Sequence, residues 1–158
     1  MPDVPRANTS QNGIILDPAT IIEQGTFWTL ALNRNQNLLG KVMLLANRPV
    51  EEVTALTLDE WFALHIQIRR ATTALIKAFQ PDHFNYAFLQ NQDRQVHLHI
   101  IPRYATSRMF EVLTFDDPDY PSHYAVPAPT RHLGAAQAQA LGNLLHALLP
   151  PLPAGERG

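Results

Sequence analysis

The sequence predicts an α+β domain built on an antiparallel sheet of about five strands, with one long helix and a C-terminal helix. Hydrophobic periodicity gives the order strands, long helix, two strands, long loop and terminal helix. The last two strands are joined by a few polar residues, which is typical of antiparallel neighbours. A chain of 158 residues, 46% of them hydrophobic, suffices for one core. We therefore expect a single domain over residues 1–149 and a disordered tail over residues 150–158.

The first part of the chain predicts three strands. Residues 20–32 contain two β-rich runs around Gln24 and Gly25, which suit a hairpin turn because Gly accepts positive φ. Residues 33–37 read as a polar turn, and the apolar run over residues 40–46 suits a strand with one face buried. Pro49 ends this strand.

The clearest helix begins at Thr57, because Thr57 and Glu60 have the T-x-x-E spacing of a capping box. Pro81 predicts its end near Gln80. Between these points apolar residues recur three and four positions apart, which places one stripe against the sheet. The stripe consists of Trp61, Leu64, Ile68, Ala71, Leu75, Ile76 and Phe79.

The second half of the chain predicts two strands, a loop and a helix. Residues 85–89 and 96–101 form the strand pair, and Pro102 ends the second strand. Residues 104–131 show little periodicity, so we expect a covering loop. Its aromatic residues are Tyr104, Phe110, Phe115, Tyr120 and Tyr124. Apolar residues that share one face from Leu133 to Leu148 predict the last helix, which ends before Pro150.

Composition limits the partners and the chemistry. A formal charge of −2, with scattered Lys and Arg, argues against long nucleic acid as a partner and leaves a small phosphorylated ligand open. The absence of cysteine excludes disulfides, thiolate metal sites and cysteine nucleophiles. The N-terminal text lacks the layout of a signal peptide, and no apolar run approaches the roughly 20 residues that span a bilayer. We expect a cytoplasmic protein without a membrane segment.

The candidate site is the text QVHLHIIPR over residues 95–103. Side chains alternate along a strand, so Gln95, His97 and His99 point to one face and the intervening apolar residues point to the helix. Two strand rises separate the histidines by roughly 7 Å. Two imidazoles at that spacing can reach one small anionic group.

A His-x-His pair alone also fits an incidental solvated pair or a metal site. A metal site needs at least a third ligand. The other histidines are far away in the sequence and show no recognisable spacing: His65 in the helix but off its stripe, His83 in a turn, His123 and His132 in the loop, and His146 on the polar face of the last helix. We assign no metal site and no role to these five.

The residues around the histidine pair are a more specific signal of function than the pair alone. HLHIIPR, preceded by an apolar strand and an Asn/Gln-rich turn, resembles the signature of the histidine triad (HIT) family. Residues 31–61, ALNRNQNLLGKVMLLANRPVEEVTALTLDEW, resemble the family's strand, Asn-containing turn, Gly, second strand, Arg-Pro and helix entry. The resemblance covers about residues 26–104 and is closest to the Fhit-like, diadenosine polyphosphate hydrolase branch. It implies the HIT-like fold.

The resemblance also implies roles. His97 takes the position of the central, nucleophilic histidine, and His99 takes that of the third. Gln95 occupies the first position, and Lys41 follows Gly40 where the family often has His. Because a glutamine still offers a donor and an acceptor, activity stays compatible with the sequence. Reduced turnover and an altered substrate preference are the alternatives.

The implied reaction is nucleotidyl transfer. His97 Nδ1–H donates to a backbone carbonyl near residue 95, and Nε2 attacks the α-phosphorus of a dinucleoside polyphosphate or nucleoside phosphoramidate. Water then releases the nucleoside monophosphate from His97, while His99 contacts phosphate oxygens or helps the leaving group. The route requires no cofactor, although Mg²⁺ is compatible with a polyphosphate substrate.

Most of the other candidate residues have both a functional and a structural interpretation. Asn33 matches a nucleotide-contacting residue of the family or is a turn former, and Gln90 or Asn91 is expected to hold a phosphate oxygen. Phe27 and the region of Leu44 line a base pocket or belong to the core. The remaining candidates are Arg103 as a surface cap or ion pair, and Tyr104, Phe110 and Tyr120 as a specificity lid or a satellite core.

Two further classes of function stay open beside the enzyme. One is a nucleotide-binding protein of the same fold with little catalysis, which the substitutions at Gln95 and Lys41 motivate. The other is a metal-binding His-x-His protein. Since most proteins of the family pair, we also expect a homodimer.

Overall fold

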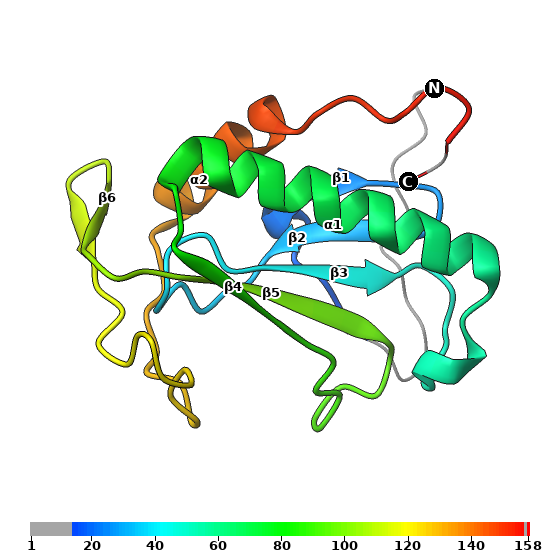
Figure 1. The fold of residues 1–158 in the computed structure, drawn as a ribbon, viewed down its shortest axis with the longest axis horizontal. Helices are drawn as coiled ribbons and strands as arrows, with labels where there is room; N and C mark the ends of the chain where they lie inside the picture. The colour runs from blue at the N-terminus through cyan, green and yellow to red at the C-terminus, as the bar shows by residue number, and fades with distance from the viewer. Residues whose placement is uncertain (1–13, 157) are drawn as a thin grey trace.

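The computed structural model describes residues 14–156 and 158. A five-stranded antiparallel sheet has the order β1-β2-β3-β5-β4. Figure 1 shows α1 and α2 over one face of this sheet, with the small β6–β7 hairpin projecting from one end. The elements are η1 Pro18–Thr20, β1 Ile21–Gln24, β2 Trp28–Leu32, β3 Val42–Ala46, η2 Val53–Ala55, α1 Leu58–Phe79, β4 His83–Ala87, β5 His97–Arg103, β6 Arg108–Phe110, β7 Leu113–Phe115 and α2 Ala135–Leu148. The α+β prediction is confirmed.

The centre of the sheet positions the histidines. β5 lies between β3 and β4, and Leu45 pairs with His97 while Met43 pairs with His99. All five residues of β3 are buried, although the sequence predicted one buried face. The second face is covered because residues 14–17 and 89–93 lie over it, around Met43 and the histidines.

Helix α1 begins with the predicted capping box: the Thr57 hydroxyl accepts from Glu60 N–H, and the Glu60 carboxylate accepts from Thr57 N–H. Gln80 ends it in the left-handed region, with φ 49°. Trp61 and Ile76 are 39% and 51% exposed, so their assignment to the buried stripe was wrong. Both sit at the border of the stripe, and the buried face is completed instead by Ala63, Ala74, Gln67 and Arg70.

Strand β5 continues past Pro102 to Arg103, contrary to prediction. Pro102 pairs with Phe84 of β4, while the ladder to β3 has already ended at Ile100. With a neighbour on one side only, the position tolerates a residue that lacks an N–H. The same pairing brings His83 into β4 instead of a turn.

Residues 104–131 are more ordered than the predicted loop, because they contain the β6–β7 hairpin. Tyr104, Phe110 and Phe115 are buried in the core, whereas Tyr120 is half-exposed. The Tyr104 hydroxyl donates to Leu39 O at 2.7 Å, and burial raises the pKa of this phenol. Tyr104, Phe110 and Phe115 therefore support the core.

Arg103 is also internal, and not a surface cap. It is 2% exposed, and its guanidinium forms a two-point ion pair with Asp117 at 2.7 and 3.1 Å. Nη1 also donates to Asn85 Oδ1. The pair links the segment after β7 to the end of β5.

The residues after α2, expected as disordered, make defined contacts where the structure describes them. Arg70 Nε donates to Pro150 O at 2.6 Å, and the same guanidinium pairs with Glu23 of β1. Phe27 N–H donates to Gly158 O at 2.7 Å. Buried polar groups of the domain thus find their partners in this segment. Within the described residues, none of the helices has the length and apolar character needed to cross a membrane.

Candidate active site

The two histidines of β5 line a cavity of about 550 Å³. Its apolar walls come from the N-terminal segment and from β2 and β3, and its polar walls come from the loops after β2 and β4. The lining residues are Ile14, Ile15, Leu16, Asp17, Thr20, Leu32, Asn33, Arg34, Met43, Leu89, Gln90, Asn91, Gln92, Asp93, His97 and His99. Sequence reasoning singled out His97, His99, Asn33, Gln90 and Asn91, and the structure brings all five together.

His97 is 5% exposed and its tautomer follows from its partner. Nδ1 lies 2.7 Å from Gln95 O. A carbonyl oxygen can only accept, so Nδ1 carries a hydrogen, and in the neutral ring Nε2 is the nitrogen with the lone pair. This is the backbone contact that the resemblance implied.

His99 is half-buried and lies against His97, with ring centroids 4.8 Å apart and planes at 75°. Burial, then the charges of His97 and Lys41, lower the pKa of His99 to about 4. The ring is therefore neutral near pH 7. Asn33 Nδ2 lies 3.5 Å from His99 Nδ1, a long contact in which the amide donates and leaves the ring hydrogen on Nε2.

Asn33 forms the predicted turn and also contacts His99 at the cavity, whereas its contact with a nucleotide stays a prediction. Its Oδ1 accepts from Asn35 N–H at 2.9 Å, as in an Asx turn, while its amide nitrogen faces His99. The turn is built around Gln36, which is 2% exposed and donates to Asn33 O and Lys41 O. Sequence reasoning missed Gln36 because nothing in the text NRNQN separates a buried amide from exposed ones.

Lys41 is 8% exposed, and its Nζ donates to Asn37 Oδ1 at 2.7 Å. Burial lowers the pKa of Lys41 to about 8. Its charge also lowers the pKa of His99, so the residue that departs from the family pattern acts electrostatically on the site.

The loop after β4 supplies the polar rim of the cavity. Gln90 has φ 48°, and its Nε2 donates to Glu51 O and Arg94 O at 2.7 and 2.6 Å. The two amide hydrogens thus hold the loop, and the amide oxygen is the group that Gln90 can offer a ligand. Asn91 is exposed at the cavity wall.

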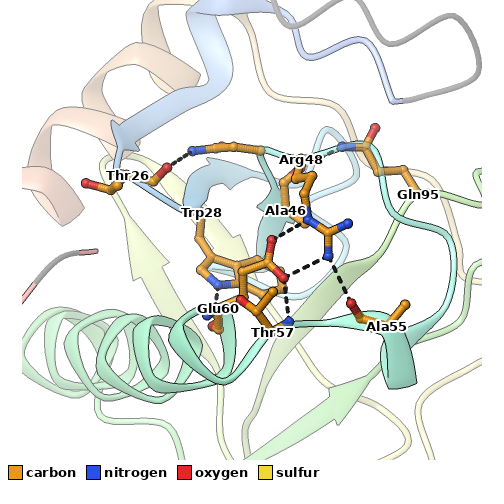
Figure 2. Close-up of polar contacts among 9 residues, drawn as sticks. Thr26, Trp28, Ala46, Arg48, Ala55, Thr57, Glu60 and Gln95 are labelled. Carbon is orange, nitrogen blue, oxygen red and sulfur yellow. Dashed lines mark hydrogen bonds and ion pairs between the residues drawn. The ribbon is translucent and has the colours of Figure 1, made fainter.

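Two predicted residues do not line the cavity. Gln95 is 4% exposed, and its Nε2 donates to Ala46 O at 2.6 Å, as Figure 2 shows. Phe27 is half-buried against the core and lines a separate small cavity with Phe62, so its assignment to a base pocket is not supported. Leu44 is fully buried in the core.

The apolar wall was missed in large part. Ile14, Ile15 and Leu16 reach the site from the start of the described chain, and Met43 comes from β3. The run of three apolar residues after a polar N-terminal text was the available signal. Its position over the sheet is set by tertiary contacts.

A polar network supports the strand ends beside Gln95. Arg48 Nε and Nη2 contact the Glu60 carboxylate at 2.8 and 3.0 Å, and Nη2 also donates to Ala55 O. Trp28 Nε1 donates to Glu60 O at 2.8 Å (Figure 2). These contacts join the segment after β3 to the first turn of α1.

The described residues contain no group of three or more histidine and acidic side chains that could hold a metal ion. His97 and His99 have the amide of Asn33 and main-chain oxygen beside them, and these groups orient imidazoles. With its hydrogen on Nε2, His99 can donate to an anionic group in the cavity.

Comparison with family models gives no match, and no curated protein matches the chain. Solved structures do match. A histidine triad protein from Bradyrhizobium japonicum superimposes with a TM-score of 0.67 at 21% identity, over 82% of this chain and 89% of that chain. A histidine triad protein from Marinobacter aquaeolei VT8 gives 0.68 at 21% identity, over 82% and 87%. The fold is therefore that of histidine triad proteins.

The matches extend to a protein named as a hydrolase. The diadenosine triphosphate hydrolase of Plasmodium falciparum superimposes with a TM-score of 0.61 at 16% identity, over 85% of this chain and 78% of that chain. At such identities the likeness establishes the fold.

Proposed function

We propose that the protein is a cytoplasmic nucleotide hydrolase or transferase that cleaves the α-phosphate bond of dinucleoside polyphosphates or nucleoside phosphoramidates. The observation that carries the proposal is the 2.7 Å contact between His97 Nδ1 and Gln95 O at the cavity wall. Because this contact keeps the hydrogen on Nδ1, Nε2 has a lone pair for attack on phosphorus. The likeness to a diadenosine triphosphate hydrolase of the same fold supports the substrate class.

The cavity suits a nucleotide in size and lining. Its volume of about 550 Å³ lies within the range of small-molecule sites, about 300–1,000 Å³. The apolar wall of Ile14, Ile15, Leu16, Leu32 and Met43 can take a base, while the histidine wall with Asn91 can take phosphate. This division replaces Phe27 as the proposed base contact. Gln90 does not fit the predicted phosphate contact, because its amide hydrogens are bound to Glu51 O and Arg94 O and its oxygen can only accept.

In the proposed reaction, His97 Nε2 forms a bond to the α-phosphorus as the bond to the leaving group breaks. Water then attacks the nucleotidyl-histidine, which releases nucleoside monophosphate and restores His97. Neutral His99, held by Asn33, donates from Nε2 to a phosphate or leaving-group oxygen. Positioned donors of this kind contribute much of the rate. The route requires no cofactor, and Mg²⁺ would accompany a polyphosphate substrate.

The first test is product analysis with diadenosine polyphosphates and an adenosine phosphoramidate. Wild type should release AMP, and His97→Ala should lower turnover by about 10³-fold or more while AMP binding stays measurable. His65→Ala, an exposed position on α1, is the matched control and should behave as wild type. Full turnover in His97→Ala would refute the assignment of the nucleophile.

The alternative is a nucleotide-binding protein with little catalysis. Gln95 favours it, because a residue of the triad position does not line the cavity. Silence across the whole substrate panel, together with AMP binding to wild type, would select this alternative. Stoichiometric Zn²⁺ in the purified protein would instead select the metal-binding reading.

We also propose a homodimer. β4 is an outer strand of the sheet, and its outer edge presents unpaired N–H and C=O groups. Beside it, Tyr86 is 50% exposed, and Trp61 is 39% exposed and packs edge-on against Phe88. A second copy that pairs along this edge would cover both features.

A further inference from the structure

We propose that Gln95 is a positioning residue: its side-chain amide holds in place the main-chain carbonyl that sets the tautomer of His97. Gln95 takes part in two hydrogen bonds, one through its side chain and one through its main chain. Nε2 donates to Ala46 O at 2.6 Å, and the main-chain oxygen accepts from His97 Nδ1 at 2.7 Å. The predicted effect of Gln95 on turnover rests on the proposed function, whereas its predicted effect on the His97 tautomer does not.

The ladder between β3 and β5 is interrupted next to His97. β3 and β5 pair as far as Leu45 and His97. At the next pair, Ala46 N–H donates to Val96 O at 3.1 Å, but Val96 N–H does not return the bond to Ala46; it donates to Val50 O at 2.8 Å. In a regular antiparallel ladder such a pair exchanges both bonds. Ala46 O therefore loses its ladder partner.

The Gln95 side chain fills that place. Its amide N–H occupies the acceptor that the ladder leaves at Ala46 O, and the contact is buried. A buried carbonyl without a donor would destabilise the fold, because it loses its hydrogen bond to water and gains none. The side-chain bond thus keeps residues 95–96 against β3 where the main-chain bond turns away to Val50.

The hydrogen bond from Gln95 to Ala46 O also affects His97. Because Gln95 is held at its side chain, its peptide carbonyl is held in one direction, toward His97 Nδ1. The carbonyl cannot donate, so only the Nδ1–H form of the neutral ring fits it. Fixing the carbonyl therefore fixes the nucleophilic nitrogen as Nε2.

The acceptor, Ala46 O, belongs to a segment that is itself held by hydrogen bonds. Ala46 ends β3, and two residues later Arg48 is held by Glu60 and Ala55 O. Figure 2 shows Gln95 beside Ala46 and this network below them. The acceptor for Gln95 is thus anchored to the first turn of α1.

The chemistry distinguishes an amide from its close analogues. Methionine has a similar length but no donor, so Gln95→Met removes the bond to Ala46 O. A carboxyl in Gln95→Glu can donate when protonated but not when ionised, and burial raises the pKa of such a group. The two variants therefore test the hydrogen bond itself, not merely the shape.

The experiment combines nitrogen-15 NMR of the imidazoles with turnover of a diadenosine polyphosphate. Wild type should show His97 as the Nδ1–H tautomer alone. Gln95→Met should show a mixture of tautomers and a kcat lower by about 100-fold, with KM nearly unchanged, since misplacement of a reacting group has this order of effect. Gln139→Met, on the exposed face of α2, should match wild type.

Gln95→Glu supplies the second readout. While its carboxyl is protonated and His97 is neutral, the carboxyl donates to Ala46 O, so the single tautomer and most of kcat should be retained. As pH rises through the pKa of that carboxyl, the single tautomer and kcat should be lost together. Wild type should show no such decrease in its pH profile. This variant decides the matter even if Gln95→Met fails to fold.

The proposal is overturned if folded Gln95→Met keeps the single Nδ1–H tautomer and the kcat of wild type. It is equally overturned if Gln95→Glu shows no pH-dependent change of tautomer. If wild type turns over no substrate, the proposed function fails, while the NMR comparison still decides the role of Gln95.

Discussion

Among the buried Lys, Arg and Glu side chains that the structure describes, Lys41 alone has no ion pair. Its ammonium has a neutral partner, the Asn37 amide, and none of the ion pairs among the described residues includes it. A buried ammonium loses hydration that an amide oxygen replaces only in part. We interpret Lys41 as a residue whose buried charge costs stability.

The cost of Lys41 can be measured by replacing it. A pKa lowered from 10.5 to about 8 corresponds to about 3 kcal/mol, less about 1 kcal/mol for the lost hydrogen bond. Lys41→Met should therefore raise the free energy of unfolding at pH 7 by about 2 kcal/mol, as urea denaturation would show.

The free energy of unfolding should depend on pH, because the pKa of Lys41 is lower in the folded chain than in the unfolded chain. Between pH 8 and 10.5 the unfolded chain binds the proton more tightly than the folded one, so wild type gains stability as pH rises. The advantage of Lys41→Met should shrink over that range. Lys77→Met, at an exposed position of α1, should show no such trend. A constant difference at all pH values would contradict the assignment of the pKa to burial.

At the scale of elements, the first turn of α1 organises the support of the site. The Glu60 carboxylate accepts from Thr57 N–H and pairs with Arg48, and the Glu60 carbonyl accepts from Trp28. Arg48 first, and Thr57 second, lower the pKa of Glu60 to about 2 against the opposing effect of burial. One residue thereby joins the helix start, β2 and the segment after β3.

Glu60→Gln should weaken this junction. We expect a loss of about 2 kcal/mol in the free energy of unfolding at pH 7, since the charge-assisted pair with Arg48 is removed while the amide oxygen can still accept from Thr57 N–H. The contribution of Glu60 is present above the unfolded pKa of 4.5 and is lost as pH falls through about 2. The variant and wild type should therefore converge in acid, as thermal unfolding at several pH values would show.

Asp59→Asn is the matched control for Glu60→Gln. Asp59 lies in the same first turn of α1, but it is exposed and takes no part in the capping box. Its replacement should change the free energy of unfolding only slightly. An equal loss in both variants would indicate a general charge effect at the helix N-terminus.

At the scale of the whole molecule, one edge of the sheet differs from the other. The β1 side is linked to α1 through the Arg70–Glu23 ion pair and is flanked by the segment that ends at Gly158. The β4 side carries exposed Tyr86 and Trp61. A stable interface is therefore expected at β4 and not at β1.

Light scattering after gel filtration tests the dimer. Wild type should have twice the 17.7 kDa mass of the chain. Trp61→Lys should shift the mass toward the monomer, because a charge would enter an apolar contact. Met109→Lys, at an exposed position of β6, should leave the mass unchanged. A monomeric wild type at all concentrations would contradict the proposal.

The fold was predictable where the signal is local. Period-two alternation over residues 96–101 placed His97 and His99 on one face, and the spacing of Thr57 and Glu60 placed the start of α1. The signals failed where pairing partners decide, as at Pro102, which stays in the strand because β3 has already ended. The hairpin within residues 104–131 was missed because three-residue strands carry too little periodicity.

The sequence by itself determined the α+β class, the order of the elements and the pair of histidines, because these depend on contacts between near neighbours in the chain. Only the tertiary structure decided the rest of the site. It brings Asn33 to His99 across 66 positions, turns the Gln95 side chain to Ala46 and buries Lys41 close enough to His99 for its charge to lower the pKa of that ring. These contacts arise from strand pairing and burial between distant segments, for which a single sequence carries no local pattern.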